Sequence, residues 1–153
     1  MDKEEKILMK TQIIEVCKEK QIKTIENLNR EMEDCQQMAN DYGPPKDRYD
    51  AFRSQMLRKR DFFAQQMQKA NQELIMLNAI NPSPLKKKVE FGAIVITDKQ
   101  KYFIAVSLGK IMLDNEEFLS VSPAVPIFKA LSGLEQGDTA KFNDKMLQII
   151  DVF

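Results

Sequence analysis

Histidine and tryptophan are both absent from this sequence of 153 residues, and the first absence excludes several classes of site. Without His, neither Ser-His-Asp nor Cys-His catalysis can operate, and no metal ion can be held by imidazole. Two cysteines are present, Cys17 and Cys35, and they form no CxxC motif. Because both lie in sequence with helical periodicity, we expect buried thiols that act as small hydrophobic side chains.

The sequence also lacks an excess of positive or negative charge. Lys and Arg total 23, and Asp and Glu total 23. A chain without net charge has no overall attraction to nucleic acid or to an anionic membrane, so any electrostatic targeting must be local. No apolar run approaches the ~18 residues of a membrane span, and the charged residues 1–5 are unlike a secretory signal. We therefore expect a cytoplasmic protein without a membrane partner.

Glycine and proline are scarce, and their positions divide the chain. Residues 3–40 and 46–79 contain neither, and Gly43-Pro44-Pro45 lies between them. Gly suits the end of one helix and Pro the first turn of the next. Both segments carry apolar residues at alternating steps of three and four, which form a seam along each helix and predict an antiparallel coiled-coil hairpin reaching roughly 50 Å. The seam includes Ile25, Leu28, Met32, Cys35 and Ala39 in the first segment and Met56, Phe63, Met67 and Ala70 in the second. A helical bundle closed by dimerisation is the alternative.

Several positions interrupt this pattern. Lys18 and Gln21 break the seam of the first segment, while Arg53 and Arg60 fall on the seam of the second. A charge at such a position destabilises the helix pair unless it is paired or reaches water. Three apolar residues lie off the seam and are expected to pack on the sheet domain that the second half of the chain predicts: Ile13, Val16 and Ile22.

A different composition begins near residue 89 and predicts a small sheet domain. β-Branched and aromatic residues dominate five short segments, and a helix is expected at Pro126–Leu131, ended by Gly133. The predicted strands cover residues 89–97, 102–108, 118–121, 141–142 and 146–152. We therefore expect an α+β chain. It would comprise a coiled-coil arm at 1–80 with its tip near 41–47, a solvated basic linker at 81–88, and an antiparallel sheet domain at 89–153.

The second half also carries a resemblance to a known family. Residues 89–95 read VEFGAIV and are similar to an opening strand of the type V-x-F-G-S-x-V. Residues 119–121 and 126–133 (LSV and PIFKALSG) resemble an I-S…S-P-I-x-x-A-L-x-G segment, and residues 147–152 resemble a closing strand. Together, downstream of a helical hairpin, these segments resemble the bacterial Gre transcript-cleavage factors.

The resemblance implies an FKBP-like C-terminal domain that docks on RNA polymerase at its secondary channel. It also implies a coiled coil that passes down the channel. Acidic residues at its tip would help to hold a catalytic Mg²⁺ shared with the polymerase, because carboxylate oxygens suit this ion. Docking would involve the segment with Ser122, Pro123, Pro126 and Ile127, although Val125 stands where the family has Ser.

The tip departs from the family pattern D-x-x-E-N-x-E-Y. With Tyr49 set on the final Tyr, Tyr42 and Pro45 occupy the two acid positions, and neither can ligate Mg²⁺. Three acids lie nearby and are the tip candidates: Asp41, Asp47 and Asp50. Asp41 is the candidate for the shared Mg²⁺, whereas helix capping and dipole complementation are the plainer interpretation of all three.

Basic residues gather on the second helical segment and have two interpretations. Arg53, Arg58, Lys59 and Arg60 could contact the nascent RNA 3′ end through its phosphates. Alternatively, these bases could pair across the hairpin with the acids at positions 31, 33 and 34.

The resemblance and the altered tip together predict the function. We expect a monomeric Gre-like transcription elongation factor that binds RNA polymerase with weak or no stimulation of cleavage. It would be no enzyme, at most a cofactor for the polymerase's own RNA cleavage. A coiled-coil scaffold or chaperone-like protein is the alternative, and an FKBP-type prolyl isomerase is a further one.

Overall fold

A computed structural model describes residues 1–41 and 47–153, with the side chains of 47–50 outside the description. The chain forms two compact units, one from Met1–Lys20 and Met76–Phe153, the other from Gln21–Ile75. The predicted arm boundary at residue 80 and the predicted linker at 81–88 both fall inside the first unit. Nowhere in the described parts is a helix long and apolar enough to cross a membrane.

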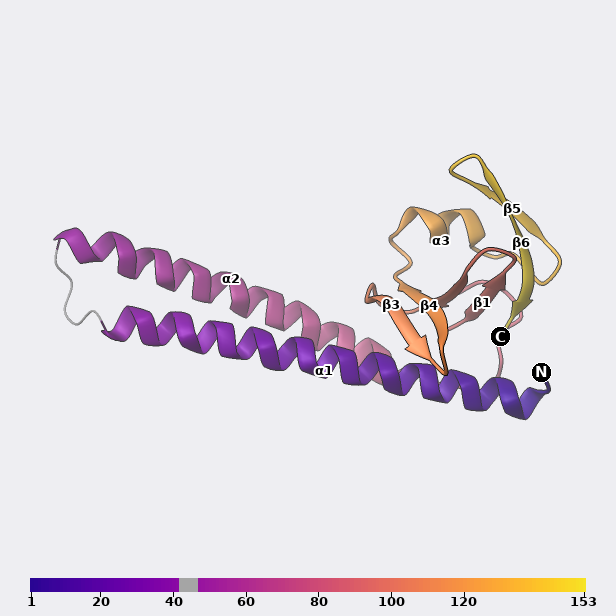
Figure 1. Ribbon diagram of the computed structural model, residues 1–153, viewed down its shortest axis with the longest axis horizontal. Coiled ribbons are helices and arrows are strands. Elements are labelled where there is room, and N and C mark those ends of the chain that lie inside the picture. Colours follow the sequence, from indigo (N-terminus) through magenta and orange to yellow (C-terminus); the bar gives the residue numbers. More distant parts are fainter. Residues whose placement is uncertain (42–46) are drawn as a thin grey trace. The chain divides into compact units, whose positions relative to one another are not determined.

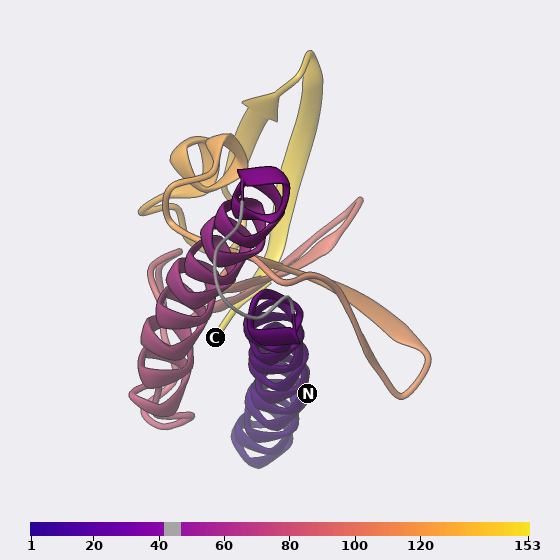
Figure 2. The same ribbon diagram turned by 90° about the vertical axis from the view of Figure 1, so that its left-hand side faces the viewer.

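The unit Gln21–Ile75 is a helical hairpin (Figures 1 and 2). It contains the C-terminal half of α1 (Lys3–Asp41) and most of α2 (Asp47–Asn78). The predicted seam is buried at Cys35, Ala39, Met56 and Ala70. Gln21, predicted to interrupt the seam, is buried, and its Nε2 donates a hydrogen bond of 2.9 Å to the carbonyl of Ala70. Near the other end of the hairpin, Arg53 hydrogen-bonds the carbonyl of Ala39. The start of one helix segment thus lies beside the end of the other, so the two helices run antiparallel.

The other unit contains one six-stranded sheet in the order β3-β4-β2-β1-β6-β5. Its strands are β1 (Ile94–Thr97), β2 (Lys101–Ile104), β3 (Gly109–Leu113), β4 (Glu116–Val121), β5 (Thr139–Phe142) and β6 (Lys145–Val152). The one short helix, α3, spans Pro126–Leu131 as predicted, with Pro in its first turn and a positive φ at Gly133 beyond its end. The predicted α+β class is therefore confirmed.

The core of this unit lies on both faces of the sheet, because neighbouring strand residues point to opposite sides. Ile94 and Phe103 pack with Ile13 and Cys17 of α1, whereas their neighbours on β1 and β2 pack with α3. The first turns of α1 thus complete a core that residues 89–153 would build only in part. The prediction that Ile13 and Val16 pack on the sheet is confirmed, but Ile22 is 44% exposed.

The strand predictions need four corrections, of which the simplest is that β2 ends at Ile104 and not at residue 108. The sheet is mixed, since β2 and β4 pair in parallel. Strand β1 begins at Ile94 and not at residue 89, because Gly92 has a φ of +89° and the Ala93 N–H closes a turn onto the Glu90 carbonyl at 3.0 Å. Strand β3 was not predicted at all. It pairs with β4 around Asp114 and Asn115, which both have positive φ values typical of a tight hairpin turn.

Residues 81–88 are more than the predicted solvated linker, although Lys87 and Lys88 are exposed. Leu85 packs against the core, Lys86 pairs with Glu90 at 3.1 Å, and Lys88 forms a β-bridge with Glu135. The next residue, Val89, is buried and exchanges backbone hydrogen bonds with Gly133 and Leu134. This segment is thus an integral part of the sheet-containing unit.

Candidate functional site

The end of α1 carries the tip candidate Asp41. This residue is the last of the helix and is exposed, and its Oδ1 accepts a hydrogen bond of 2.7 Å from Gln37 Nε2 one turn earlier. The bond orients the carboxylate on the helix surface and leaves it further acceptor capacity. Asp41 could therefore offer an oxygen to a metal ion, but only as one ligand among several supplied elsewhere.

The other two tip candidates lie in the first turn of α2. Asp47 and Asp50 occupy the positive end of that helix dipole, where a carboxylate is stabilising. Their side chains lie outside the described residues, as do Tyr42 and Pro45, which stand at the acid positions of the resemblance. Within the parts that are described, no three Cys, Asp or Glu residues lie together so that they could hold a metal. The described acids thus do not form a Mg²⁺ site by themselves.

Two of the four basic candidates connect the helices of the hairpin. Arg53 Nε donates a hydrogen bond of 3.1 Å to the carbonyl of Ala39, near the end of α1. Arg60 hydrogen-bonds Gln36 of α1 and pairs with Asp61, its own neighbour, at 2.7 Å. These contacts explain how two guanidinium groups are accommodated on the seam: each meets a polar atom of the hairpin itself.

The other two basic candidates, Arg58 and Lys59, are exposed. Of the acids predicted to pair with them, Glu33 accepts a hydrogen bond from Asn29 on its own helix. Among the described residues no ion pair joins Glu31, Glu33 or Asp34 to a base of α2. The predicted cross-helix pairing is therefore wrong for these acids, and Arg58 and Lys59 present their charges to solvent.

The predicted docking segment precedes and begins α3. The backbone N–H of Ser122 donates to Ser107 Oγ at 3.1 Å, and the N–H of Val125 donates to the Ser122 carbonyl at 3.3 Å, which shapes the turn before the helix. Pro126 is exposed at the start of α3, whereas Ile127 is only 8% exposed and packs in the core. The surface available for docking here thus comes from Ser122, Pro123 and Pro126, and their role stays a prediction.

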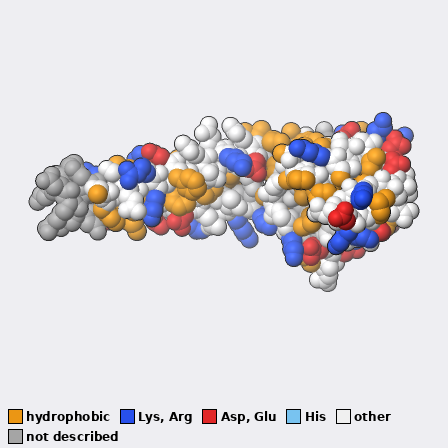
Figure 3. Space-filling view, turned by 90° about the horizontal axis from the view of Figure 1, so that it is seen from above, with side chains coloured by type: hydrophobic (Ala, Val, Ile, Leu, Met, Phe, Trp, Pro, Cys, Tyr) orange, Lys and Arg blue, Asp and Glu red, His pale blue; other side chains and the backbone are white. Residues whose placement is uncertain are grey.

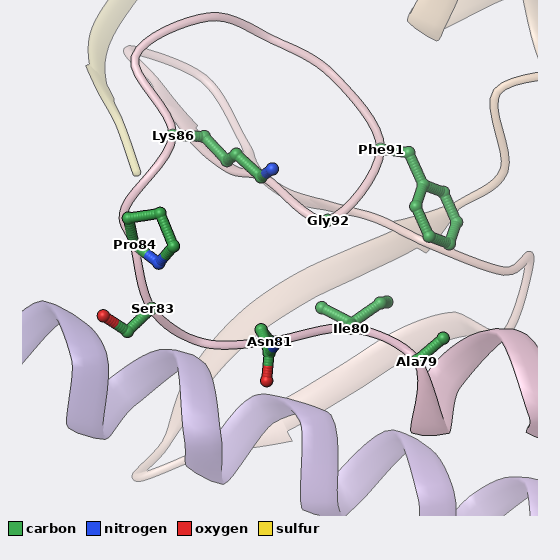
Figure 4. Close-up of a pocket in the computed structure, with 8 residues that line it drawn as sticks. All are labelled: Ala79, Ile80, Asn81, Ser83, Pro84, Lys86, Phe91 and Gly92. Atoms are coloured by element: carbon green, nitrogen blue, oxygen red, sulfur yellow. The ribbon is translucent and has the colours of Figure 1, made fainter.

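A cavity that the sequence did not indicate lies against the segment before β1. It measures about 290 Å³, and Figure 4 shows the Lys86 side chain pointing into the loop that surrounds it. Its lining comes from Ala79, Ile80, Asn81, Ser83, Pro84, Lys86, Phe91 and Gly92. A second cavity of about 430 Å³ shares Pro84 and Lys86 with the first and adds Lys3, Lys6 and Lys87.

The most unusual charged group of this unit is Lys10 of α1. Its side chain is fully buried, and Nζ has no hydrogen-bond partner among the described residues. Burial, followed by repulsion from Lys86, lowers the pKa of Lys10 to about 8, and Glu90 opposes this only in part. Helical spacing places Lys10 on the face of Ile13, Ile14 and Cys17, but a lysine on an amphipathic helix is ordinarily read as solvent-facing.

Burial also makes Cys17 an inert thiol. Its side chain is completely inaccessible in the core between α1 and the sheet. Desolvation raises the pKa of Cys17 to about 11, against smaller opposing effects of Ser120 and Lys20. With Cys35 also buried, both cysteines are free thiols, as predicted, and neither is placed for nucleophilic chemistry.

Comparisons with known proteins yield one distant likeness. No protein-family model matches the chain, and no curated protein matches it. Among solved structures, the chain is similar to GreA factor homolog 1 (Gfh1) of Thermus thermophilus, with 13% identity and a TM-score of 0.34 over 89% of this chain and 94% of that one. A likeness this distant assigns no role to any residue.

Proposed function

We propose that this protein is a Gre-like regulator that binds bacterial RNA polymerase at the secondary channel and modifies elongation in the cytoplasm. The observation that supports this most is the placement of the segments with Gre-like sequence. Val89 and Val95 of the first segment, Ile127 and Leu131 of the second, and Leu147 of the third pack in one core cluster. Three separate matches in the sequence thus belong to one packed unit, in a chain that also contains a long helical hairpin.

The proposal includes weak or no stimulation of transcript cleavage. Carboxylates are the ligands that Mg²⁺ prefers, and the two positions where the resemblance places them hold Tyr42 and Pro45. Asp41 is exposed and could contribute an oxygen to an ion that the polymerase itself holds. Such an ion, when bound, would polarise the scissile phosphate and its attacking water. The protein would then be a cofactor of the polymerase's own hydrolysis and no enzyme in itself.

Transcript cleavage in a stalled, backtracked elongation complex tests this function. Bound protein that changes elongation without shortening the RNA is the expected result. Shortened RNA would make the protein a cleavage factor, and Asp41→Asn should then remove that activity, with Glu26→Gln at an exposed position of α1 as the control. A protein that neither binds the polymerase nor affects elongation would overturn the proposal.

Contact with the extruded RNA is a separate part of the proposal and rests on Arg58. Its guanidinium is exposed and has no ion pair among the described residues. Arg58→Glu should weaken binding to a backtracked complex more than binding to core polymerase, and the difference should shrink with added salt. Lys69→Glu, an equal charge reversal elsewhere on α2, is the control. Equal weakening for both polymerase forms would exclude the RNA contact.

A further inference from the structure

A groove of about 660 Å³ opens on one side of the hairpin unit. Cys35 and Met56 are buried beneath it, while Met38 is 48% exposed and Phe62 is 55% exposed. Figure 3 shows hydrophobic side chains on the hairpin beside the grey residues, with charges of both signs around them. The groove is lined by Glu31, Asp34, Cys35, Met38, Phe52, Met56, Lys59, Phe62 and Phe63. Met38 and Phe62 thus leave apolar surface uncovered beside the buried Cys35 and Met56.

The spacing of these residues identifies the kind of surface. On α1 the lining residues recur at 31, 34, 35 and 38, and on α2 at 52, 56, 59 and 63. Steps of three and four place each set in one stripe along its helix. Cys35 and Met56 belong to the seam, and Met38 and Phe62 extend the apolar surface beyond it on the same side of the hairpin. Two further helices laid into this groove would complete a four-helix bundle.

The charges at the edge of the groove indicate which kind of binding partner would fit it. Glu31 and Asp34 come from α1 and Lys59 from α2, and in the described parts of the chain none of the three has an ion-pair or hydrogen-bond partner. A partner of one charge sign would be repelled by one side of the groove, whereas a second copy of this chain offers both signs. Isologous contacts use the same patch on both subunits, so a patch with both signs can be self-complementary.

The same charges select the symmetry axis. A two-fold axis parallel to the helices places α1 of one copy against α2 of the other, so Glu31 and Asp34 face Lys59. A two-fold axis across the helices places α1 against α1, so acids face acids. Like charges in close opposition are unfavourable, which disfavours the second arrangement.

We propose that two copies of this chain associate through the groove into a four-helix bundle whose two-fold axis runs along the hairpins. Lys59 of each copy lies opposite Glu31 and Asp34 of the other, and Phe62 and Met38 enter the shared core. The association uses only the hairpin unit, and its test requires no polymerase. A hairpin paired in this way is not free to enter the secondary channel, so the dimer and the proposed polymerase complex would be alternative states. The dimer replaces the sequence-based expectation of a monomer.

Complementary charge reversal tests the dimer, with sedimentation velocity between micromolar and near-millimolar concentration as the readout. Wild-type protein should dimerise, whereas Lys59→Glu and the double variant Glu31→Lys/Asp34→Lys should each be monomeric. An equimolar mixture of the two variants should dimerise again, because every rim contact in it joins opposite charges. Lys69→Glu, with the same charge change away from the groove, should behave as wild type. Circular dichroism checks that each variant keeps its helices.

Three outcomes would overturn the proposal: a wild-type protein that stays monomeric, variants that still dimerise, or a mixture that does not recover. Spin labels at Lys23→Cys then test the axis, since both native thiols are buried. Position 23 lies about 18 Å along α1 from Cys35 at ~1.5 Å per residue. With the proposed axis, the two labels lie at the same height along the bundle, so only the width of the bundle separates them. An axis across the helices would instead separate them by about 36 Å along the bundle, and that result would reject the arrangement.

Discussion

Replacing the buried Lys10 by Met should raise the free energy of unfolding of this protein. The Lys10 side chain is fully buried and its ammonium has no hydrogen-bond partner among the described residues. The pKa falls from the ordinary 10.5 to about 8, mainly because burial penalises the charged form. A tenfold change in an acid constant corresponds to about 1.4 kcal/mol, so this lowering opposes the charged form by roughly 3 kcal/mol at neutral pH.

Methionine keeps the length and apolar body of the side chain and lacks the charge. We therefore expect Lys10→Met to raise the free energy of unfolding at pH 7 by about 1–3 kcal/mol, the lower figure allowing for imperfect packing. Urea denaturation followed by circular dichroism measures this difference. Lys141→Met, at an exposed position of β5, is the matched control and should change stability by less than about 0.5 kcal/mol.

The pH dependence provides the sharper test. Between pH 8 and 10.5 the unfolded chain keeps the Lys10 proton while the folded chain has lost it, so wild-type stability gains with rising pH. The Lys10→Met variant lacks this gain, and its advantage should shrink across that window. The titrations of Cys17 and Tyr102, whose pKa values burial raises, occur in both proteins and cancel in the difference. A variant less stable than wild type at pH 7, or an advantage independent of pH, would refute the reasoning.

Three further predictions concern the interior of the two units. Ser120→Ala removes a buried hydrogen bond of 2.6 Å to the Val106 carbonyl and should cost about 1–3 kcal/mol in urea denaturation, so an unchanged midpoint would contradict that role. In a Cys35→Ala background, Cys17 should react with a disulfide reagent at pH 8 only as fast as the protein unfolds, since its raised pKa leaves about a thousandth as thiolate. Fast reaction with native protein would show that the thiol is accessible. Gln21→Leu should cost about 1 kcal/mol by removing the bond to Ala70, and a stabilised variant would show that an apolar residue suits this position better.

The elements that the sequence predicted well are those with strong local signals. The absence of Gly and Pro from residues 3–40, together with a regular apolar spacing, was enough to place α1. Pro126 at the first turn and Gly133 beyond the last gave α3 its bounds. The predicted strands at 141–142 and 146–152 leave a short gap, and in the structure Asn143 and Asp144 form a tight turn there with positive φ values.

The features that the sequence did not reveal depend on contacts between distant segments. The parallel pairing of β2 with β4 has no local signal, because neither strand carries information about its neighbour. Strand β3 was missed because it is short and largely exposed, so its residues 109–113 carry little apolar pattern. The turn that follows it is marked in the sequence by Asp114-Asn115. The environment of Lys10 also depends on a distant segment, since Lys86 and Glu90 before β1 act on its ammonium group. The candidate tip residues Asp47 and Asp50 stay predictions, because their side chains lie outside the described residues.

Competition for RNA polymerase tests the central claim most directly. Labelled protein is bound to purified bacterial RNA polymerase, and an unlabelled Gre factor is titrated into the complex. The proposed function predicts saturable binding that the Gre factor displaces completely, since both would occupy the secondary channel. Simultaneous binding of the two proteins, or no binding of this one to any form of the polymerase, would contradict it.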